Sequence, residues 1–404
     1  MSHHSIGRRK FLKTAVAGTT AAALGAAARD AFAFPAKPAL EAGLGSAPAP
    51  AAGLPANILG KTGQRVPRLL LGTAMDFDMR LLKTAYEQGV TYFDTADCYG
   101  GGRSELTIGN FLEKTGLRKN IWLTTKSCPQ DPRAMENSLK TSLGRLKTDY
   151  VDLFFLHNLS RMEALDGEMR QTVDRLKREG RIRFFGFSTH SPNVAEALEH
   201  ASKLGWIEAI MFKYNFRAYG DSELNRAMDA AKRASIGLIA MKTQGSAFSF
   251  QNKVDAFQVK GFQKHPAVLK AVWEDQRIDA AVSEMKNVQQ LDQNVGAAKD
   301  LTKLGALELD ELRRYAQETS ASYCRGCNHV CTAGLPRPVA VADTLRFLMY
   351  HDEYGELERA RRLFRELPAP LREFHASELE AAARACPHGL DVASLVTRAK
   401  KVLG

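Results

Sequence analysis

The sequence lacks several features that would mark common classes of protein. Its 404 residues include only 6 cysteines and 3 tryptophans, and no GxGxxG motif follows the first apolar run of strand length. The missing glycine motif argues against a Rossmann dinucleotide-binding domain. Runs of lysine and arginine interleaved with aromatic residues are also missing, so the net charge of +11 indicates solubility rather than nucleic-acid binding.

The N-terminal segment has no apolar run long enough to stay in a bilayer as a helix. It contains the paired arginines of "GRRKFLK" (7–13), an Ala-rich run and the small residues "AFA" (31–33). This pattern resembles a twin-arginine export signal, with Gly7 where Ser or Thr is usual; a basic disordered tail is the alternative. We expect a signal peptide over 1–33, read by the twin-arginine export machinery, and a flexible linker over 34–56. The protein is then periplasmic or exported, without stable membrane insertion.

Strand-length apolar runs alternate with helical patterns from residue 57 to about 300. Leu139, Leu143 and Leu146, for example, have helical spacing before the fourth run. Eight alternations without repeated sequence predict an α/β fold, a (β/α)8 TIM barrel, with an open sheet of eight parallel strands as the alternative. The eight runs lie at 68–73, 91–97, 121–127, 150–157, 183–189, 208–215, 237–243 and 278–285.

Polar side chains stand near the ends of three consecutive runs. Asp94 lies in the second run and Tyr99 just beyond it. Lys126 lies near the end of the third run, and His157 ends the fourth. In a TIM barrel the carboxyl ends of the strands form one rim, where catalytic residues gather. A lone strand-end histidine is more often structural, but four polar groups on three neighbouring strands predict a catalytic site.

Several segments resemble the aldo-keto reductase family over about 57–300, which implies a barrel domain over 57–305. The resemblance implies an NAD(P)-dependent oxidoreductase that transfers a hydride between a nicotinamide cofactor and a small carbonyl or alcohol substrate. The segments are "LGKTGQRVPRLLLGTA" (59–74), "FDTADCYGGGRSE" (93–105), "TTKS" (124–127), "FLHNL" (155–159), "GFSTH" (186–190) and "SEMKNVQQLDQN" (283–294).

The resemblance also assigns the catalytic work among the four polar residues. Tyr99 is the general acid/base, Lys126 lowers the pKa of that phenol, and Asp94 holds Lys126 in place. His157 orients the carbonyl oxygen and stabilises its developing charge. An unperturbed tyrosine has a pKa of about 10, too high for work near neutrality, so the neighbouring ammonium matters.

The residues implied for cofactor binding depart further from the family pattern. Ser188 stands where the family bonds the carboxamide, but Thr189 replaces the usual Asn. In the last segment Gln290 replaces a frequent Arg, and Lys286 is either a phosphate ligand or a solvated surface charge. The cofactor is NADP, with NAD as the alternative. Lys286, Asn287 and Asn294 are assigned to its 2′-phosphate and adenine, and Gln290 is also counted among the cofactor-binding residues.

Four of the six cysteines lie in the C-terminal part of the chain. Cys324, Cys327 and Cys331 form the group "CRGCNHVC", and Cys386 precedes a proline far downstream. This arrangement resembles ferredoxin-type ligation of one [4Fe–4S] cluster, which some aldo-keto reductases carry in a C-terminal extension. A zinc ion on four thiolates and a pair of disulfides are the alternatives. Helical spacing over 342–364 predicts a helical extension, 306–404, that folds around the metal.

Two classes of function follow from these patterns. The first is an exported aldo-keto reductase with an iron–sulfur extension, acting on a small carbonyl and exchanging electrons with a redox partner protein. The second is an electron-transfer or partner-binding protein on a catalytically retired barrel, which the altered cofactor positions favour. Cys98 and Cys128, beside Tyr99 and Lys126, are interpreted as ordinary buried or loop thiols.

Overall fold

The computed structural model describes residues 53–73, 77–159, 161–190, 194–244, 264–320, 323–326, 328–352 and 355–404. The predicted signal peptide, nearly all of the linker and Cys327 lie outside these residues. Eight parallel strands form a closed barrel in the order β10-β3-β4-β5-β6-β7-β8-β9. They are β3 (Leu69–Gly72), β4 (Tyr92–Asp94), β5 (Trp122–Ser127), β6 (Val151–Leu156), β7 (Ile182–Thr189), β8 (Ala209–Lys213), β9 (Gly237–Met241) and β10 (Ala280–Glu284).

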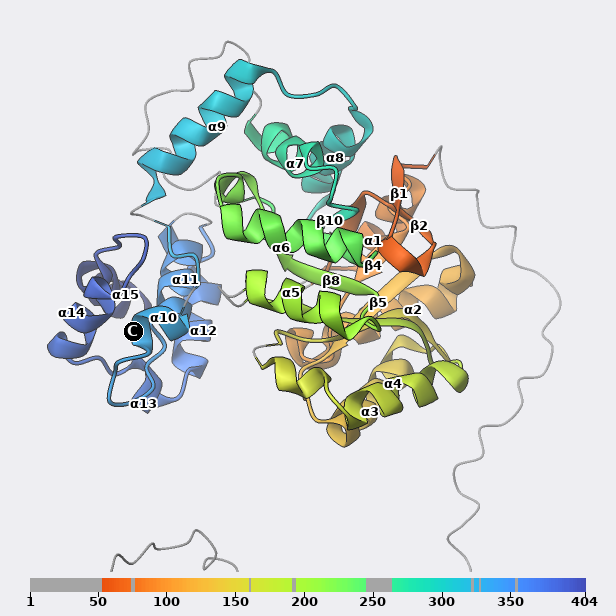
Figure 1. The fold of residues 1–404 in the computed structure, drawn as a ribbon, viewed down its shortest axis with the longest axis horizontal. Helices are drawn as coiled ribbons and strands as arrows, with labels where there is room; N and C mark the ends of the chain where they lie inside the picture. The colour runs from red at the N-terminus through yellow and green to blue at the C-terminus, as the bar shows by residue number, and fades with distance from the viewer. Residues whose placement is uncertain are drawn as a thin grey trace, which may run out of the picture. The chain divides into compact units, whose positions relative to one another are not determined.

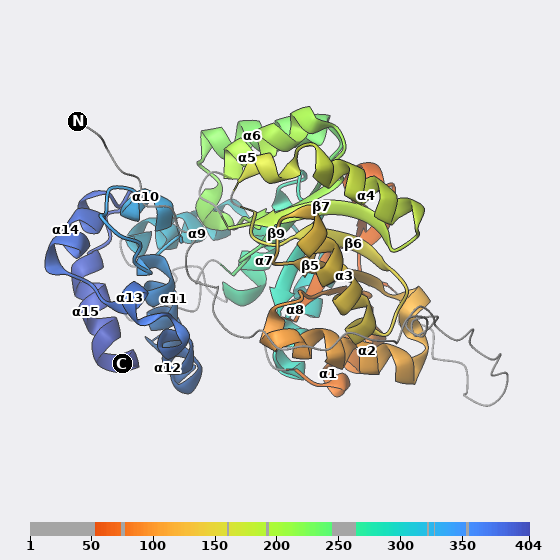
Figure 2. The same ribbon diagram turned by 90° about the horizontal axis from the view of Figure 1, so that it is seen from below.

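The predicted TIM barrel is confirmed, and each of the eight barrel strands falls on one of the eight apolar runs. Closure excludes the open sheet, because β10 pairs in parallel with both β9 and β3. The surrounding helices, which follow the strands in turn (Figures 1 and 2), are α1 (Met79–Glu87), α2 (Arg103–Thr115), α3 (Pro132–Leu146), α4 (Glu168–Arg178), α5 (Val194–Leu204), α6 (Ser222–Arg233), α7 (Lys264–Glu274) and α8 (Val288–Lys299).

The strands read as continuous apolar runs because both faces of the sheet are covered. In β6, all six residues are buried. Leu153 and Phe155 belong to the cluster inside the barrel, whereas Phe154 and Leu156 belong to the cluster between the sheet and the helices. The two-residue period of a strand therefore divides one apolar segment between two cores.

A short hairpin closes the end of the barrel where the strands begin. β1 (Ala56–Ile58) and β2 (Arg65–Pro67) pair antiparallel, joined through the turn η1 (Gly60–Thr62). Leu59 and Val66 are fully buried and join the cluster inside the barrel. Gly237 leaves room for Leu59 here, since a Cβ at that position would lie 2.6 Å from Leu59 Cδ1. The sequence patterns did not predict this hairpin, whose strands have three residues each.

Helix α9 (Ala306–Glu318) packs on the barrel, against α7 and the short turn η5 (Phe216–Ala218). Phe216, Val268, Leu312 and Tyr315 share one apolar cluster there. The guanidinium of Arg217 donates to Ala316 O and to Thr319 Oγ1, at 3.1 and 2.7 Å. These contacts attach the start of the expected extension to the barrel.

The remaining helices form a bundle, called here the C-terminal module (323–404). Helix α11 packs against α12 and α15, and α14 packs against α15 and α10. Its core includes Val341, Leu348, Phe364 and Val396. The helices, drawn in blue in Figure 1, are α10 (Asn328–Thr332), α11 (Val341–Asp352), α12 (Leu357–Glu366), α13 (Ala369–Arg372), α14 (Ala376–Arg384) and α15 (Val392–Leu403).

Among the residues that the structure describes, no helix combines the length and the apolar character needed to cross a membrane.

Candidate active site

A buried ion pair lies where strands β4 and β5 end. Lys126 Nζ donates to Asp94 Oδ2 at 2.7 Å and to the carbonyl oxygen of Thr95 at 2.6 Å. The side chains of Lys126 and Asp94 are 1% and 4% exposed. Neighbouring parallel strands bring the two together, because Asp94 pairs in register with Thr124, two residues before Lys126. The predicted Asp–Lys pair is therefore present at the rim.

Tyr99 and His157 lie beside this pair. The Lys126 ammonium is 4.9 Å from the centre of the Tyr99 ring. The rings of Tyr99 and His157 meet edge to face, with centres 5.4 Å apart and an interplanar angle of 80°. All four predicted catalytic residues thus come together in one place, at the carboxyl ends of three consecutive strands.

A glycine-rich turn holds Tyr99 in position. Tyr99 begins the turn η2 (Tyr99–Gly102), which leads directly into α2. Gly102 has φ +91°, and a Cβ there would lie 2.4 Å from the guanidinium carbon of Arg145. That guanidinium donates to Asp97 O and to the buried carboxylate of Glu105, at 3.1 and 3.3 Å. The glycine therefore lets Arg145 approach and fasten the backbone just before Tyr99.

The electrostatics of the site differ from the sequence prediction in one respect. Burial alone would lower the pKa of Lys126, but Asp94 and Tyr99 raise it above its usual value, so the ammonium stays charged. Burial raises the pKa of Tyr99, and the nearby Lys126 ammonium opposes that rise without reversing it. The expected net lowering of the Tyr99 pKa was wrong, because a buried phenolate loses more hydration than one ammonium restores.

His157 is neutral at physiological pH. Burial, reinforced by the positive charges of Lys126 and Lys242, lowers its pKa to about 3. Its backbone is fixed by two hydrogen bonds, from His157 N to Ser127 O at 2.8 Å and from Gln130 Nε2 to His157 O at 3.0 Å. A neutral imidazole has one ring nitrogen that donates and one that accepts.

The residues predicted to hold a cofactor lie at the ends of β7 and β10. Ser188 is buried, and its Oγ accepts a hydrogen bond from Asn158 N at 3.1 Å. Asn294 is buried on α8, and its Nδ2 donates to Ser283 Oγ at 3.0 Å. Both residues are thus positioned by neighbouring strands and loops.

The start of α8 is organised as a helix cap. Asn287 Oδ1 accepts from Gln290 N, and Gln290 Oε1 accepts from Lys286 N, each at 2.9 Å. The Lys286 side chain forms an ion pair with Glu356, which precedes α12 in the C-terminal module. The Lys286 ammonium therefore already has a carboxylate partner from the module in this structure.

Some of the buried polar atoms that have no partner among the described residues lie near the rim. Asp94 Oδ1 is buried beside the ion pair and has no hydrogen-bond partner there. The side-chain amide oxygen and nitrogen of Gln244, which follows β9, are also buried without a hydrogen-bond partner among the described residues. Buried polar groups are normally satisfied, so these atoms fit a polar ligand such as a nucleotide at the rim. The region predicted to bind the cofactor phosphate fits a nucleotide less well, since Lys286 is paired with Glu356.

The C-terminal cysteines gather in the core of the module. Cys331 is buried in its apolar cluster, and Cys324 and Cys386 pack against that cluster. Helix α10, which carries Cys331, packs on α14, which ends two residues before Cys386. Three of the four predicted metal ligands therefore share one core, and Cys327 lies outside the described residues.

The sequence interpretation of Cys98 and Cys128 was wrong. Both side chains are exposed, and the structure joins them as a disulfide with Cα atoms 6.6 Å apart. Both sulfur atoms also face His157 Nδ1, at 3.4 and 3.3 Å. A signal was available in the sequence, because Cys98, Cys128 and His157 each follow one of three consecutive strands.

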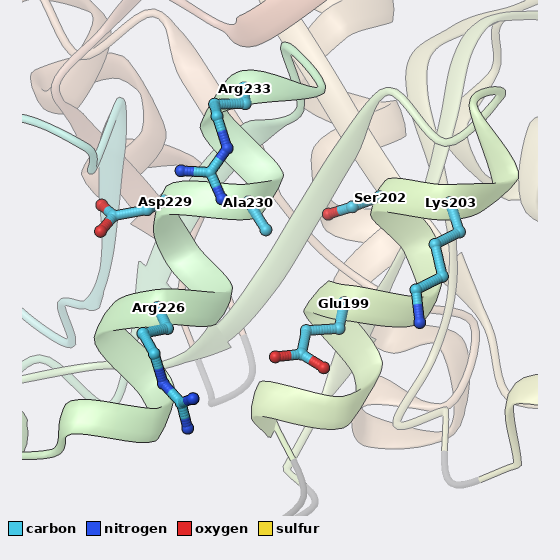
Figure 3. A pocket seen from close by; sticks show the side chains of 7 residues that line it. All are labelled: Glu199, Ser202, Lys203, Arg226, Asp229, Ala230 and Arg233. Carbon is cyan, nitrogen blue, oxygen red and sulfur yellow. The ribbon is translucent and has the colours of Figure 1, made fainter.

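A separate depression of about 400 Å³ lies between α5 and α6. Figure 3 shows that charged side chains of both helices border it, among them Glu199 and Arg226. It lies along the C-terminal halves of these helices, which run back toward the start of the next strands. The depression therefore lies away from the rim that holds Tyr99 and His157, and it contains none of the predicted site residues.

Comparison with known proteins agrees with this geometry. The model of the aldo/keto reductase family matches residues 69–320. The chain is 30% identical over 270 residues to the uncharacterized oxidoreductase YqkF of Bacillus subtilis, covering 62% of this chain and 85% of that protein. It is 26% identical over 282 residues to the aldo-keto reductase yakc (NADP(+)) of Schizosaccharomyces pombe, covering 58% of this chain and 80% of that protein.

Among solved structures, the aldo-keto reductase AKR11C1 from Bacillus halodurans, in its holo form, has the same fold. The superposition gives a TM-score of 0.56 at 22% sequence identity, and it covers 65% of this chain and 96% of that chain. The family model ends at residue 320, so the C-terminal module lies beyond the part of the chain that it matches.

Proposed function

Because the chain belongs to the aldo/keto reductase family, a family of oxidoreductases, we propose that it reduces a small carbonyl compound with NADPH. The observation that carries the proposal is the buried Asp94–Lys126 pair beside Tyr99 and His157 at the barrel rim. The relative from Schizosaccharomyces pombe, whose name includes NADP(+), supports that cofactor over NAD.

The chain's residues would act on the carbonyl oxygen. When bound, the nicotinamide supplies the hydride; Ser188, Asn294 and the capped start of α8 are the residues that would hold the cofactor. Tyr99 donates its phenolic proton to the oxygen as negative charge develops there. Lys126 stays charged beside the ring and stabilises the phenolate that remains. The neutral His157 donates an N–H to the same oxygen and orients the carbonyl.

Substitution of Tyr99 tests this function. Tyr99→Phe removes the proton donor and leaves the ring contact with His157, so kcat/KM for a small aldehyde with NADPH falls by about 10²–10⁴-fold. Tyr150→Phe is the matched control, because Tyr150 lies just before β6, at the opposite end of that strand from His157. The activity of this variant should equal that of the wild type. Equal activity of Tyr99→Phe and wild type would refute the assignment.

We further propose that the module binds one [4Fe–4S] cluster through Cys324, Cys331, Cys386 and Cys327, with zinc as the alternative. The convergence of three cysteines on one apolar core supports it. Iron and sulfide analysis together with visible absorption separates the two, since a zinc protein is colourless. Zinc without iron or sulfide would contradict the cluster.

Export through the twin-arginine route is also proposed, from the sequence of the N-terminal segment. Arg8→Lys combined with Arg9→Lys preserves the charge and removes the paired arginines, so the protein should accumulate in the cytoplasmic fraction. Unchanged distribution between cell fractions would contradict this route.

A second function, electron transfer on a barrel that no longer binds nucleotide, is favoured by the Lys286–Glu356 pair. Under that function, NADPH does not quench the intrinsic fluorescence of the purified protein. Saturable quenching would exclude it and support the reductase.

A further inference from the structure

Two cysteines and a histidine converge beside the proposed catalytic residues. The Sγ atoms of Cys98 and Cys128 and the ring nitrogen Nδ1 of His157 all lie within 4.8 Å of one another. The two sulfurs are 3.4 and 3.3 Å from the nitrogen. These residues follow β4, β5 and β6, so adjacent strands of a closed barrel determine their arrangement.

The backbone of this group is held in place on several sides. Cys128 N donates to the carboxylate of Asp97, at 3.2 and 3.1 Å to its two oxygens. The same carboxylate accepts a hydrogen bond from Ser138 Oγ at 2.5 Å. The carbonyl oxygens of Asp97 and His157 accept from Arg145 and Gln130. Supporting hydrogen bonds of this kind position the ligands of metal sites.

The sulfur–nitrogen distances match those of a tetrahedral zinc ion. With Zn–S of about 2.3 Å and Zn–N of about 2.0 Å, tetrahedral geometry places a ligand sulfur about 3.5 Å from a ligand nitrogen. The observed separations of 3.4 and 3.3 Å are close to that value. Two cysteines and one histidine also form a known catalytic zinc set, with the fourth position open to an exogenous ligand.

We propose that, when reduced, Cys98, Cys128 and His157 bind a soft divalent cation, Zn²⁺, at the barrel rim. The site does not depend on the proposed carbonyl reduction, and it is separate from the four cysteines of the C-terminal module. The fourth ligand is water or another small oxygen or sulfur ligand from solution.

The disulfide is the competing state of the same two cysteines. A dithiol reductant transfers two electrons and two protons to the Cys98–Cys128 bond, which yields two thiols while the reductant forms its own disulfide. Binding of Zn²⁺ then displaces the two thiol protons, and the sulfurs separate to about 3.8 Å, the distance set by two Zn–S bonds in a tetrahedron. The Cα separation of 6.6 Å lies at the upper end of the disulfide range, so this adjustment requires little backbone movement.

Metal binding would also fix the tautomer of His157. A cation on Nδ1 occupies the accepting nitrogen and leaves the proton on Nε2. The metal-bound form therefore keeps an N–H donor on the side of the ring away from the cysteines.

Cobalt titration of the full-length protein, reduced with a dithiol and freed of excess reductant, tests the site. Co²⁺ replaces Zn²⁺ and gives thiolate charge-transfer and tetrahedral ligand-field bands. Wild type should bind one more equivalent of Co²⁺ than Cys98→Ser or Cys128→Ser. Cys331→Ser is the matched control, because it alters the module and should retain the rim equivalent.

Two outcomes would overturn the proposal. One is that Cys98→Ser and Cys128→Ser each bind as many equivalents as wild type, with the same bands. The other is that Cys98 and Cys128 remain linked after reduction, as shown by resistance to alkylation in mass spectrometry of the folded protein. The readout is metal content rather than turnover, so failure here is distinguishable from failure of Tyr99→Phe to lose activity.

Discussion

The barrel rim and the C-terminal module place reactive side chains in opposite surroundings. At the rim, Lys126 already has Asp94 and Thr95 as partners, on strands closed into a sheet by their neighbours. In the module, Cys331 is buried among apolar side chains of short helices, with Cys324 and Cys386 beside it. The first arrangement pairs a buried ammonium with a carboxylate, whereas the second gathers three cysteines around a small core.

This difference indicates that the two regions obtain their stability from different sources. A barrel of this size buries enough apolar surface to fold without a ligand. The module has roughly 80 residues, a size at which a single core gives only a few kcal/mol and a metal or disulfide commonly adds the rest. The rim should therefore persist in the absence of any bound group, and the module should not.

The largest effect is expected from breaking the ion pair at the rim. Lys126→Met leaves the Asp94 carboxylate buried and unpaired, so the free energy of unfolding should fall by about 3–5 kcal/mol. Activity should fall at least as far as in Tyr99→Phe. Chemical denaturation and steady-state kinetics measure the two effects.

A double variant provides the control for that prediction. Lys126→Met with Asp94→Asn removes both charges and should recover much of the stability without recovering activity. Recovery of activity would show that the ammonium is not needed beside Tyr99.

Removal of the proposed metal group tests the other side of the comparison. A ligand present at about 100 times its dissociation constant stabilises its site by about 2.7 kcal/mol, so its loss should open the module. Cys386→Ser should therefore speed proteolysis within 323–404 about 100-fold, while the barrel fragment stays intact. Equal protease resistance of the variant and wild type would mean that the module folds on its core alone.

A pH measurement sharpens the description of the barrel, where Asp275 is paired with Arg277. Burial alone would raise the pKa of Asp275, but hydrogen bonds from Arg277 and Tyr214 lower it below its usual value. A carboxyl whose pKa is lower in the folded state stabilises that state above about pH 4. This stabilisation is lost as the pH falls through the pKa of the folded state. Asp275→Asn should cost about 1–3 kcal/mol at pH 7 and less at pH 3.

The prediction would be contradicted if the difference in stability between Asp275→Asn and wild type stayed the same from pH 7 to pH 3. Thermal unfolding of both proteins across that pH range provides the measurement, with Asp229→Asn as the control because Asp229 is half-exposed and contacts only one arm of Arg277.

The smallest effect is expected where the two regions meet. Glu356→Gln releases Lys286, so NADP should bind a few times more tightly, since a partly exposed ion pair contributes about 1 kcal/mol or less. Binding of NAD, which lacks the 2′-phosphate, should not change. Glu358→Gln is the matched control, because Glu358 is an exposed neighbour on α12.

Most of the barrel was predictable because each strand is a local feature of the sequence. "VDLFFL" is apolar on both faces, which distinguishes a covered parallel strand from a half-exposed one. The Asp94–Lys126 pair was also predictable, because the two residues lie in the later parts of two consecutive strands. The pKa of Tyr99 was not predictable. It depends on how burial balances the nearby ammonium, and the spacing of residues in the sequence does not show how the side chains pack.

Other features depend on contacts between distant parts of the chain. Lys286 and Glu356 are 70 positions apart, and nothing local to Lys286 shows that it is already paired. The hairpin of β1 and β2 was missed because three-residue strands carry almost no pattern. Cys98 and Cys128 belong to the predictable kind, and a rule that compared residues just after consecutive strands would have found them.

The pairing of β10 with β3 has a consequence for how the molecule is made. A ribosome delivers Leu69 early and Ala281 much later, yet these two residues are partners in the finished sheet. Until the later strand emerges, the nascent protein exposes an unsatisfied strand edge that invites association with other chains. Chaperone occupancy during synthesis should therefore persist until the last strand has left the exit tunnel.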